Sequence, residues 1–398
     1  MKLKPAAKQA IMIACMCFSS YLSVYVAKNV LGAVSPEMIE KGVITTENVG
    51  SLSSIYFITY AIGQLINGRI GDKIKSKYMI SFGLVFAGVC NFLFLNFVDT
   101  VSIAYITYAA MGFFLSMIYG PMTKTVAENT EPQYTTRCAL GYTFASFLAS
   151  PIAGALASVI IWKSVLKTSS ALLIVMGIIC LIVFSIFDRK GIIQYGKYKR
   201  EKEKGNIKVL LKHRLVKFMA IAMITGIVRT TVVFWLPTYI SQYLNFSTQK
   251  ATLIFSVATF AISMIAPLAV FIYERLGNNM DLTIRVAFSM ASIFFLMVFL
   301  FKFPIVNIVC LVLAIMMSGM AATMTFSRYC PSLRDTGMVS TATGIIDFSS
   351  YIAAATASKL FANAVEQIGW NKLILVWFGL MILGVIISLP YDKINRRS

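Results

Sequence analysis

Residues 222–241 read AMITGIVRTTVVFWLPTYIS, an almost wholly apolar run with one charge near its centre, Arg229. A helix needs about 20 such residues to cross the roughly 30 Å hydrocarbon core of a bilayer. A charge at the middle of a span costs roughly 2.5–3.5 kcal/mol on insertion scales. The stretch therefore predicts a membrane-spanning helix, and the cost of Arg229 indicates that this cation has a function.

The composition of the whole chain supports this prediction. Of its 398 residues, 58% are hydrophobic and 13% are charged, and the mean hydropathy is +0.77. Soluble domains carry about 25% charged residues. Lys2, Lys4 and Lys8 precede an apolar run of spanning length that lacks a small-residue cleavage site, so we expect no cleaved signal peptide. We expect a polytopic membrane protein.

Apolar runs of spanning length recur along the sequence. They predict an all-α membrane protein with about twelve transmembrane helices. The fifth and eleventh runs are rich in Ala, Ser, Thr and Gly, and we expect them inside the bundle because small residues let membrane helices approach closely. The predicted spans begin near Gln9, Gly50, Met79, Val101, Arg137, Lys167, Val216, Lys250, Thr283, Pro304, Gly337 and Asn371.

The formal charge of +20 results from 36 Lys and Arg against 16 Asp and Glu. With both termini in the cytoplasm, about 27 of the cations lie on the cytoplasmic side and about 6 outside, as the positive-inside rule requires. We therefore expect a multi-pass protein of the cell membrane, inner or plasma, with both termini cytoplasmic. The basic residues alternate with apolar runs and form no flat basic face, so no nucleic-acid partner is expected.

The chain divides into two related halves. Its longest polar segment predicts a basic cytoplasmic linker at 189–215 between bundles at 1–188 and 216–398. Residues 139–154 (ALGYTFASFLASPIAG) align without a gap with residues 342–357 (ATGIIDFSSYIAAATA), and Lys28 and Arg229 are separated by nearly the same offset. Two pseudo-symmetric six-helix bundles are typical of transporters, whose substrates bind near the midplane between the halves.

Sites that need a metal, a cofactor or nucleotide hydrolysis are not indicated. The seven cysteines are scattered without metal-ligand or disulfide spacing, and the single histidine, His213, lies in a basic loop. The sequence contains no Gly-x-x-x-x-Gly-Lys-Ser/Thr phosphate loop. We expect neither an enzyme nor a bound metal or cofactor.

A glycine-containing basic loop follows the second span. Residues 68–78 read GRIGDKIKSKY, and a Gly-x-x-x-Asp-Lys/Arg loop followed by basic residues resembles the signature of the major facilitator superfamily. The resemblance implies close helix contact at Gly68 and Gly71, and a conformational latch that includes Asp72 and Lys73. Asp72 would pair with basic groups or helix ends. The alternative is an ordinary positive-inside loop that contains glycine.

A narrower resemblance extends through the whole chain. YVAKNV (25–30), GRIGDK (68–73), RTTVVFWLPTY (229–239) and ATGIIDFSSYIAAATA (342–357) resemble the organophosphate:phosphate antiporter family. That family includes the glycerol-3-phosphate and hexose-phosphate transporters. The Arg followed by Trp-x-Pro-Thr-Tyr is the most specific of these matches, and related organic-anion branches of the superfamily have similar skeletons.

The resemblance implies a phosphate group held by two arginines, one on the first span and one on the seventh. Arg229 matches the second arginine in position and in flanking motif. The first arginine is missing, because Ala27 stands in its place, whereas the following Lys28 and Asn29 match. The alternative role for Lys28 is to snorkel from the outer part of its span.

At other site positions of the family, this sequence has the family residue in some cases and a different residue in others. Tyr60 and Tyr351 match family tyrosines, and Tyr119 stands where the glycerol-phosphate branch has tryptophan. Gln64 replaces a lysine, and the fifth-span histidine of the family falls at or near Leu148. Much of the positive charge of a phosphate cage is therefore absent, which favours a monoanion or carboxylate over a dianionic phosphoryl group.

Asp347 is the one clearly intramembrane carboxylate of the sequence. It lies one helical turn before Tyr351, so both side chains are expected on one face of their helix. Three roles stay open: an ion pair with a cation such as Arg229, an acceptor for a substrate hydroxyl, and a proton-coupling group.

Together these features predict secondary transport of a small anion by alternating access, with antiport as the expected mode. Arg229 and Lys28 would attract the substrate to the midplane. Two other functions stay open: proton-coupled symport of an organic or sugar acid with Asp347 as the coupling group, and a transporter-like sensor that binds its ligand without flux. The expected partners are the anion and the lipid bilayer, with the protein acting as a monomer.

Overall fold

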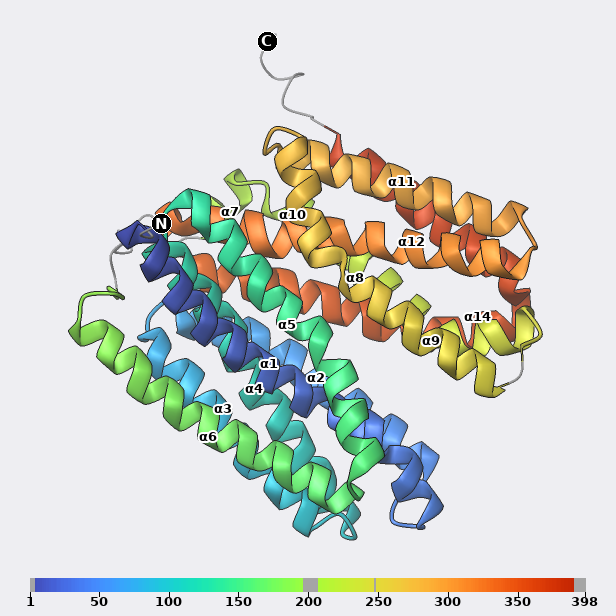
Figure 1. Ribbon diagram of the computed structural model, residues 1–398, viewed down its shortest axis with the longest axis horizontal. Coiled ribbons are helices and arrows are strands. Elements are labelled where there is room, and N and C mark those ends of the chain that lie inside the picture. Colours follow the sequence, from blue (N-terminus) through green and yellow to red (C-terminus); the bar gives the residue numbers. More distant parts are fainter. Residues whose placement is uncertain (1–3, 196–206, 247, 390–398) are drawn as a thin grey trace. The chain divides into compact units, whose positions relative to one another are not determined.

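The computed structural model describes residues 4–195, 207–246 and 248–389 (Figure 1), and all regular structure in these ranges is helical. Each predicted span begins inside or beside one of the longer helices. These are α1 (Pro5–Glu40), α2 (Thr46–Gly71), α3 (Ser76–Asn96), α4 (Val101–Asn129), α5 (Pro132–Val159), α6 (Trp162–Arg189), α8 (Leu215–Thr238), α9 (Thr248–Ser263), α10 (Ile265–Arg275), α11 (Met280–Leu300), α12 (Pro304–Met324) and α14 (Val339–Ser388).

Short elements complete the description. They are α7 (Ile207–Lys212), α13 (Cys330–Ser332), the π-helical turns η1 (Tyr239–Tyr243) and η2 (Thr325–Tyr329), and the 3₁₀ turn η3 (Leu333–Thr336). Helix α7 lies in the predicted linker, of which residues 196–206 are outside the described ranges.

Within the described residues, eight helices are long and apolar enough to cross a membrane, or nine if α9 and α10, bent by 43°, form one span. Neither α2 nor α8 is among these eight, although the sequence predicts a span in each. Helix α14 has 50 residues and covers the last two predicted spans, with a break at Gly369, whose φ is 73°. The described chain therefore has the all-helical, multi-pass architecture that the sequence predicts.

The contacts divide the chain into two units, and unit 1 contains residues 1–213 together with 330–348. In unit 1, α1 packs against α5 and α6, α2 against α4, and α3 against α4 and α6 (Figure 1). Glycines allow these helices to approach closely: a Cβ at Gly88 would lie 2.9 Å from the carbonyl oxygen of Ser170, and a Cβ at Gly177 would lie 2.9 Å from that of Ser81.

The grouping of residues 330–348 with unit 1 differs from the predicted bundle boundaries at 1–188, 189–215 and 216–398. These residues belong to the second half of the sequence, yet the start of α14 meets α2. A Cβ at Gly344 would lie only 2.2 Å from the carbonyl oxygen of Gln64. The division by sequence stays a prediction, since this helix contributes residues to both units.

Unit 2 contains residues 214–329 and 349–398. Here α8 packs against α9 and α12, and α11 packs against α12. Asp281 at the start of α11 accepts hydrogen bonds from Arg214 Nη1 (2.8 Å) and Lys217 Nζ (3.3 Å). At the other end of α8, Tyr239 is buried and its hydroxyl donates to Asn307 Oδ1 at 2.6 Å. Tyr239, the last residue of the stretch RTTVVFWLPTY, is therefore a structural anchor.

Replacing Tyr239 with phenylalanine is expected to lower the free energy of unfolding by about 1–3 kcal/mol, because it leaves a buried acceptor on Asn307 without its donor. The Asn307 amide nitrogen already donates to the carbonyl oxygens of Val298 (2.9 Å) and Phe301 (3.1 Å), so the side chain is not free to turn. Thermal unfolding of the purified protein in detergent measures the loss. The control is Tyr243→Phe, whose hydrogen bond to Asn371 is exposed. Equal losses in both variants would contradict the anchoring role of Tyr239.

Candidate substrate site and the contact between α2 and α14

Lys28 on α1 lies among aromatic rings of unit 1. Its Nζ is 4.8 Å from the ring centroid of Tyr25, 5.3 Å from that of Phe57 and 5.1 Å from that of Tyr60. A cation within about 6 Å of a ring centroid is attracted by the negative face of the ring. Tyr25 lies one turn before Lys28 on α1, and Phe57 and Tyr60 lie three residues apart on α2. The ammonium group is thus placed inside an aromatic cage, which we define as Tyr25, Phe57 and Tyr60.

A second group of tyrosines extends this cage toward α4. Tyr21 stacks on Tyr119 with ring centroids 5.1 Å apart, and its hydroxyl donates to the Tyr25 hydroxyl at 3.3 Å. Tyr142 of α5 meets both Tyr21 and Tyr119 edge-on, at 5.9 and 6.0 Å. The predicted residue Tyr119 is therefore joined to the Lys28 cage through tyrosines that were not among the predicted site residues.

Asp347 of α14 faces the same tyrosines. Its side chain is buried, and its carboxylate interacts electrostatically with Tyr21, Tyr60 and Tyr119. Unit 1 therefore gathers four of the predicted site residues, Lys28, Tyr60, Tyr119 and Asp347, around one aromatic cluster. Such a cluster offers a cation, an anion and several hydroxyl groups to a polar ligand.

Three further predicted positions surround this cluster. Gln64 is 1% exposed and lies one turn beyond Tyr60, where its amide is next to the Tyr60 hydroxyl but completes no hydrogen bond of standard geometry within the described residues. Asn29 is half-buried beside Lys28 on α1. Ala27, which stands in place of the family's arginine, is buried.

Arg229 and Tyr351 belong to unit 2. Arg229 is half-buried on α8. One turn before it, Gly226 packs against α14, where an added Cβ would lie 2.7 Å from the carbonyl oxygen of Ser350, the neighbour of Tyr351. The two predicted residues are thus placed on helices in close contact. That Arg229 and Lys28 bind one anion together stays a prediction.

Asp72, directly after α2, caps the start of α14. Its Oδ1 accepts the backbone N–H of Ser340 at 3.0 Å, and its Oδ2 accepts the backbone N–H of Thr341 at 2.9 Å and the Thr341 hydroxyl. The first N–H groups of a helix have no partner within the helix, and a negative charge there is favoured by the helix dipole. We call these three hydrogen bonds the Asp72 cap. The sequence predicts a basic group or a helix end as the partner of Asp72. In the structure the carboxylate hydrogen-bonds the helix end, and the charge of the nearby Lys124 also acts on it.

Glycines bring α2 and α14 together at the Asp72 cap. A Cβ at Gly68 would lie 2.9 Å from the carbonyl oxygen of Ser340 and 3.1 Å from Gly344 Cα. A Cβ at Gly71 would lie 2.3 Å from the Ser340 hydroxyl oxygen. Neither position therefore has room for a larger residue while the two helices keep this contact.

Lys124 of α4 supports the end of α2. Its buried Nζ donates to the carbonyl oxygens of Gly71 (3.2 Å) and Asp72 (2.8 Å), where a cation is favoured by the helix dipole. Lys73, the remaining residue of the predicted latch, is exposed; its backbone N–H donates to the Ile70 carbonyl oxygen at 2.9 Å, and its side chain makes no hydrogen bond or ion pair within the described part of the chain.

The Asp72 cap is expected to strengthen as pH falls. Burial raises the pKa of the Asp72 carboxyl, and the hydrogen bonds from Thr341 and the charge of Lys124 oppose that rise only in part. A carboxyl released into water returns to its ordinary pKa, so the capped state binds a proton more readily than the uncapped state. The equilibrium therefore shifts toward the capped state as the pH falls below the raised pKa of the capped carboxyl. The shift is complete once the pH is also below the ordinary carboxyl pKa.

Distances between spin labels on Lys73→Cys and Asp335→Cys measure this effect, since both positions are exposed in the described structure. The exposed native thiol Cys15 is replaced by serine. The Asp72→Asn variant does not titrate and should show no such pH dependence. A capped fraction that falls with acidification in the Asp72 protein would contradict the expected direction.

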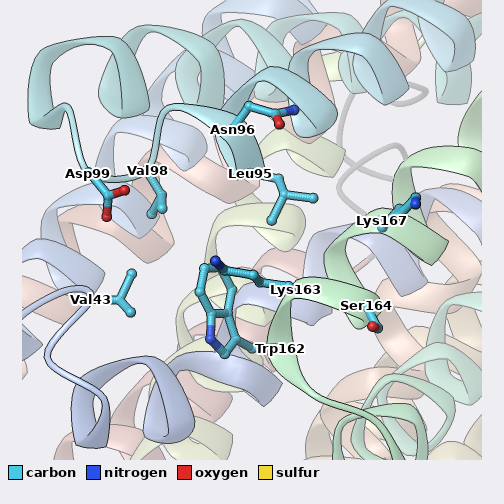
Figure 2. Close-up of a pocket in the computed structure, with 9 residues that line it drawn as sticks. All are labelled: Val43, Leu95, Asn96, Val98, Asp99, Trp162, Lys163, Ser164 and Lys167. Carbon is cyan, nitrogen blue, oxygen red and sulfur yellow. The ribbon is translucent and has the colours of Figure 1, made fainter.

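Two cavities lie in unit 1 away from these residues. One has a volume of about 340 Å³ and is bounded by the end of α3, the loop after it and the start of α6. Figure 2 shows Trp162 and Lys163 side by side in this cavity, with Asp99 on another wall. The other, of about 480 Å³, is lined by Gln9, Glu128 and Arg334 among others. Neither includes a predicted substrate residue. Among the described residues, no group of three His, Cys, Asp or Glu side chains is arranged to hold a metal ion.

The sequence was compared with protein families and with known proteins. The sequence profile of the Major Facilitator Superfamily matches residues 13–358. The Phosphoglycerate transporter protein of Salmonella typhimurium LT2 is 23% identical over 421 residues, which covers 96% of this chain and 88% of that transporter. The Membrane sensor protein UhpC of the same bacterium is 30% identical over 74 residues, which are 19% of this chain and only 17% of the sensor.

Solved structures share the fold over nearly the whole chain. The human organic anion transporter MFSD10 aligns with a TM-score of 0.75 at 12% identity, covering 97% of this chain and all of that one. The transporter FucP in its outward conformation aligns with a TM-score of 0.74 at 12% identity, covering 96% of this chain and 100% of that one. At this identity the likeness concerns the fold alone.

Proposed function

The chain belongs to the major facilitator superfamily, and on that premise we propose that it exchanges a small phosphate-bearing organic acid for inorganic phosphate across the cell membrane. Members of this superfamily are multi-pass secondary transporters and not enzymes. The observation that carries the proposal is the placement of Lys28 inside a cage of aromatic rings, with Tyr119 and Asp347 beside it. The full-length similarity to a phosphoglycerate transporter supports an organophosphate as the substrate.

The chemistry of the site suits an anion with hydroxyl groups. Arg229 offers a planar fork of donors for a phosphate or carboxylate, and Lys28 offers a second positive charge. Tyrosine hydroxyls and the Asp347 carboxylate provide hydrogen-bond partners for the hydroxyl groups of the substrate. An acid that carries both a phosphate and a carboxylate would place one of these groups at each of the two cations.

The Asp72 cap supplies the conformational part of the proposal. With both termini cytoplasmic, the loop 68–78 lies on the cytoplasmic side, so the cap closes the cytoplasmic end between α2 and α14. Anion binding neutralises the half-buried cations Lys28 and Arg229. The cap then opens and re-forms as the site alternates between the two sides of the membrane. An empty site keeps its charge and resists this transition, which enforces one-for-one exchange.

Counterflow in proteoliposomes tests the proposal. Vesicles loaded with phosphate receive labelled phosphate or labelled 3-phosphoglycerate outside, and saturable uptake that depends on internal phosphate is the expected result. Vesicles loaded with sulfate, and vesicles without protein, are the controls. Folded protein that gives no exchange with either compound would overturn the organophosphate assignment, and carboxylates without phosphate would be tested next.

Asp347 favours a second candidate function, proton-coupled uptake of an organic acid, because a buried carboxylate beside tyrosines can carry a proton with the substrate. Under this alternative, Asp347→Asn abolishes uptake driven by a pH gradient and leaves exchange intact. Under phosphate exchange, a pH gradient drives no net uptake in either protein. A third candidate, a sensor without flux, is excluded by any turnover that exceeds stoichiometric binding.

A further inference from the structure

The cavity of about 480 Å³ in unit 1 lies apart from the proposed substrate site. It is bounded by the start of α1, the turn between α4 and α5, the segment after α6, and η3. Its polar lining is provided by Gln9, Glu128, Asn129, Glu131, Gln194 and Arg334. Hydrogen bonds brace the walls: the Gln194 backbone N–H donates to Asn129 Oδ1 at 2.7 Å, and Gln9 Nε2 donates to the Ile192 carbonyl oxygen at 2.6 Å.

Glu128 is the unusual residue of this cavity. It is 4% exposed, and among the described residues its carboxylate makes no hydrogen bond and no ion pair. Lys124 lies one turn earlier on α4 and its charge attracts the Glu128 carboxylate without direct contact, while its ammonium group donates to the carbonyl oxygens of Gly71 and Asp72. A buried carboxylate is stable when a cation or a proton compensates its charge. The cavity next to it has room for such a partner.

Arg334 on η3 contributes a guanidinium group to the same cavity. Its Nε lies 3.8 Å from Oδ1 of its exposed neighbour Asp335, the one ion pair of Arg334 within the described residues and a weak contact at the surface. Glu131 adds a second carboxylate to the lining, so with both carboxylates ionised the cavity is net negative and unfavourable for a simple anion. A volume of this size is within the range of sites that bind small molecules.

We propose that this cavity binds a small zwitterion, with a primary ammonium group at Glu128 and a phosphate or carboxylate group at Arg334. The ammonium group supplies the missing partner of the buried carboxylate, and a guanidinium fork suits an oxyanion. A metal ion is not favoured, since the described residues contain no group of three metal ligands.

The position of the cavity gives this ligand a regulatory role. It is lined by residues at the end of α4 and in η3, and η3 directly precedes the α14 residues that Asp72 holds. A ligand that bridges Glu128 and Arg334 ties together the two elements that flank the Asp72 cap. Binding therefore favours the capped state. This role is independent of which anion the protein transports.

Isothermal titration of the purified full-length protein with phosphoethanolamine tests the site. We expect saturable binding, at least tenfold weaker binding in Glu128→Gln and in Arg334→Gln, and unchanged binding in Lys302→Gln, an exposed residue outside the cavity. Ethanolamine, which lacks the anionic group, should bind more weakly than phosphoethanolamine. Glu128→Gln should itself melt at a higher temperature than the unaltered protein without ligand, which shows that the variant is folded.

Binding measured in lipid nanodiscs distinguishes two possible ligands that carry the same ammonium and phosphate groups, a free metabolite and a lipid headgroup. If phosphoethanolamine binds equally in nanodiscs of phosphatidylethanolamine and of phosphatidylglycerol, the ligand is a free metabolite. If phosphatidylethanolamine prevents the binding, the native occupant is its headgroup. No saturable binding in detergent, or saturable binding that survives both Glu128→Gln and Arg334→Gln, overturns the proposal and leaves a proton as the partner of Glu128. None of these results depends on transport.

Discussion

Replacing Arg229 with alanine is expected to lower kcat/KM for anion exchange by roughly 30- to 5,000-fold. Removing one partner of a buried, hydrogen-bonded charge pair costs about 2–5 kcal/mol, and each 1.36 kcal/mol is a factor of ten. Arg229→Lys keeps the charge but loses the planar fork, so its activity should lie between those of the unaltered protein and Arg229→Ala. Initial rates of labelled phosphate exchange in proteoliposomes provide the comparison.

The matched control for this prediction is Arg69→Ala. Arg69 lies in the last turn of α2 and is exposed, and we assign it no role in the substrate site. Its replacement should leave the KM for exchange unchanged. If Arg229→Ala retains most of the exchange activity, or if Arg69→Ala loses as much as Arg229→Ala does, Arg229 does not bind the anion.

The second large effect is expected at Gly344, where even a methyl group does not fit. A Cβ at this position would lie 2.2 Å from the carbonyl oxygen of Gln64 and 3.0 Å from Gly68 Cα, and a backbone neighbour cannot turn away as a side chain can. Overpacking of this kind costs about 1–3 kcal/mol, which corresponds to a roughly 5- to 150-fold shift away from the capped state. Exchange should fall because the cap must re-form in each cycle.

Gly379→Ala provides the comparison on the same helix. Gly379 lies in α14, and a Cβ added there would meet no neighbouring atom within 4 Å, so its replacement carries no steric penalty. Spin-label distances between Lys73→Cys and Asp335→Cys should shift in Gly344→Ala and stay unchanged in Gly379→Ala. If the capped fraction is the same in Gly344→Ala as in the unaltered protein, the Gly344 contact does not limit the approach of α14 to α2.

The helical architecture follows closely from the sequence. Backbone groups in lipid must be satisfied within the protein, so long apolar runs of this kind predict helices, and the all-helical, multi-pass class can be read from hydropathy. Intramembrane charges are costly, which is why Lys28, Arg229 and Asp347 are recognisable as candidates from sequence alone. The structure places Lys28 and Asp347 in one aromatic cluster of unit 1.

The residues that contact these charges were harder to predict from the sequence than the charges themselves. Tyrosine and phenylalanine are common in membrane helices, so Phe57 has no sequence signal that separates it from lipid-facing rings. Tyr21, Tyr25 and Lys28 do carry one, because spacings of four and three place them on one helical face. The Asp72 cap depends on residues 268 and 269 positions away in the chain, and local sequence does not encode which helix end receives the carboxylate.

A double-mutant cycle between Lys28 and Arg229 tests the central claim most directly. Phosphate binding is measured for the unaltered protein, Lys28→Gln, Arg229→Gln and the double variant. Residues that share a partner are coupled by about 0.5–3 kcal/mol, whereas residues without a common partner give additive losses. If both cations bind one anion, the double variant loses measurably less affinity than the sum of the single losses. Strict additivity, or unchanged affinity in Lys28→Gln, would contradict a shared anion site.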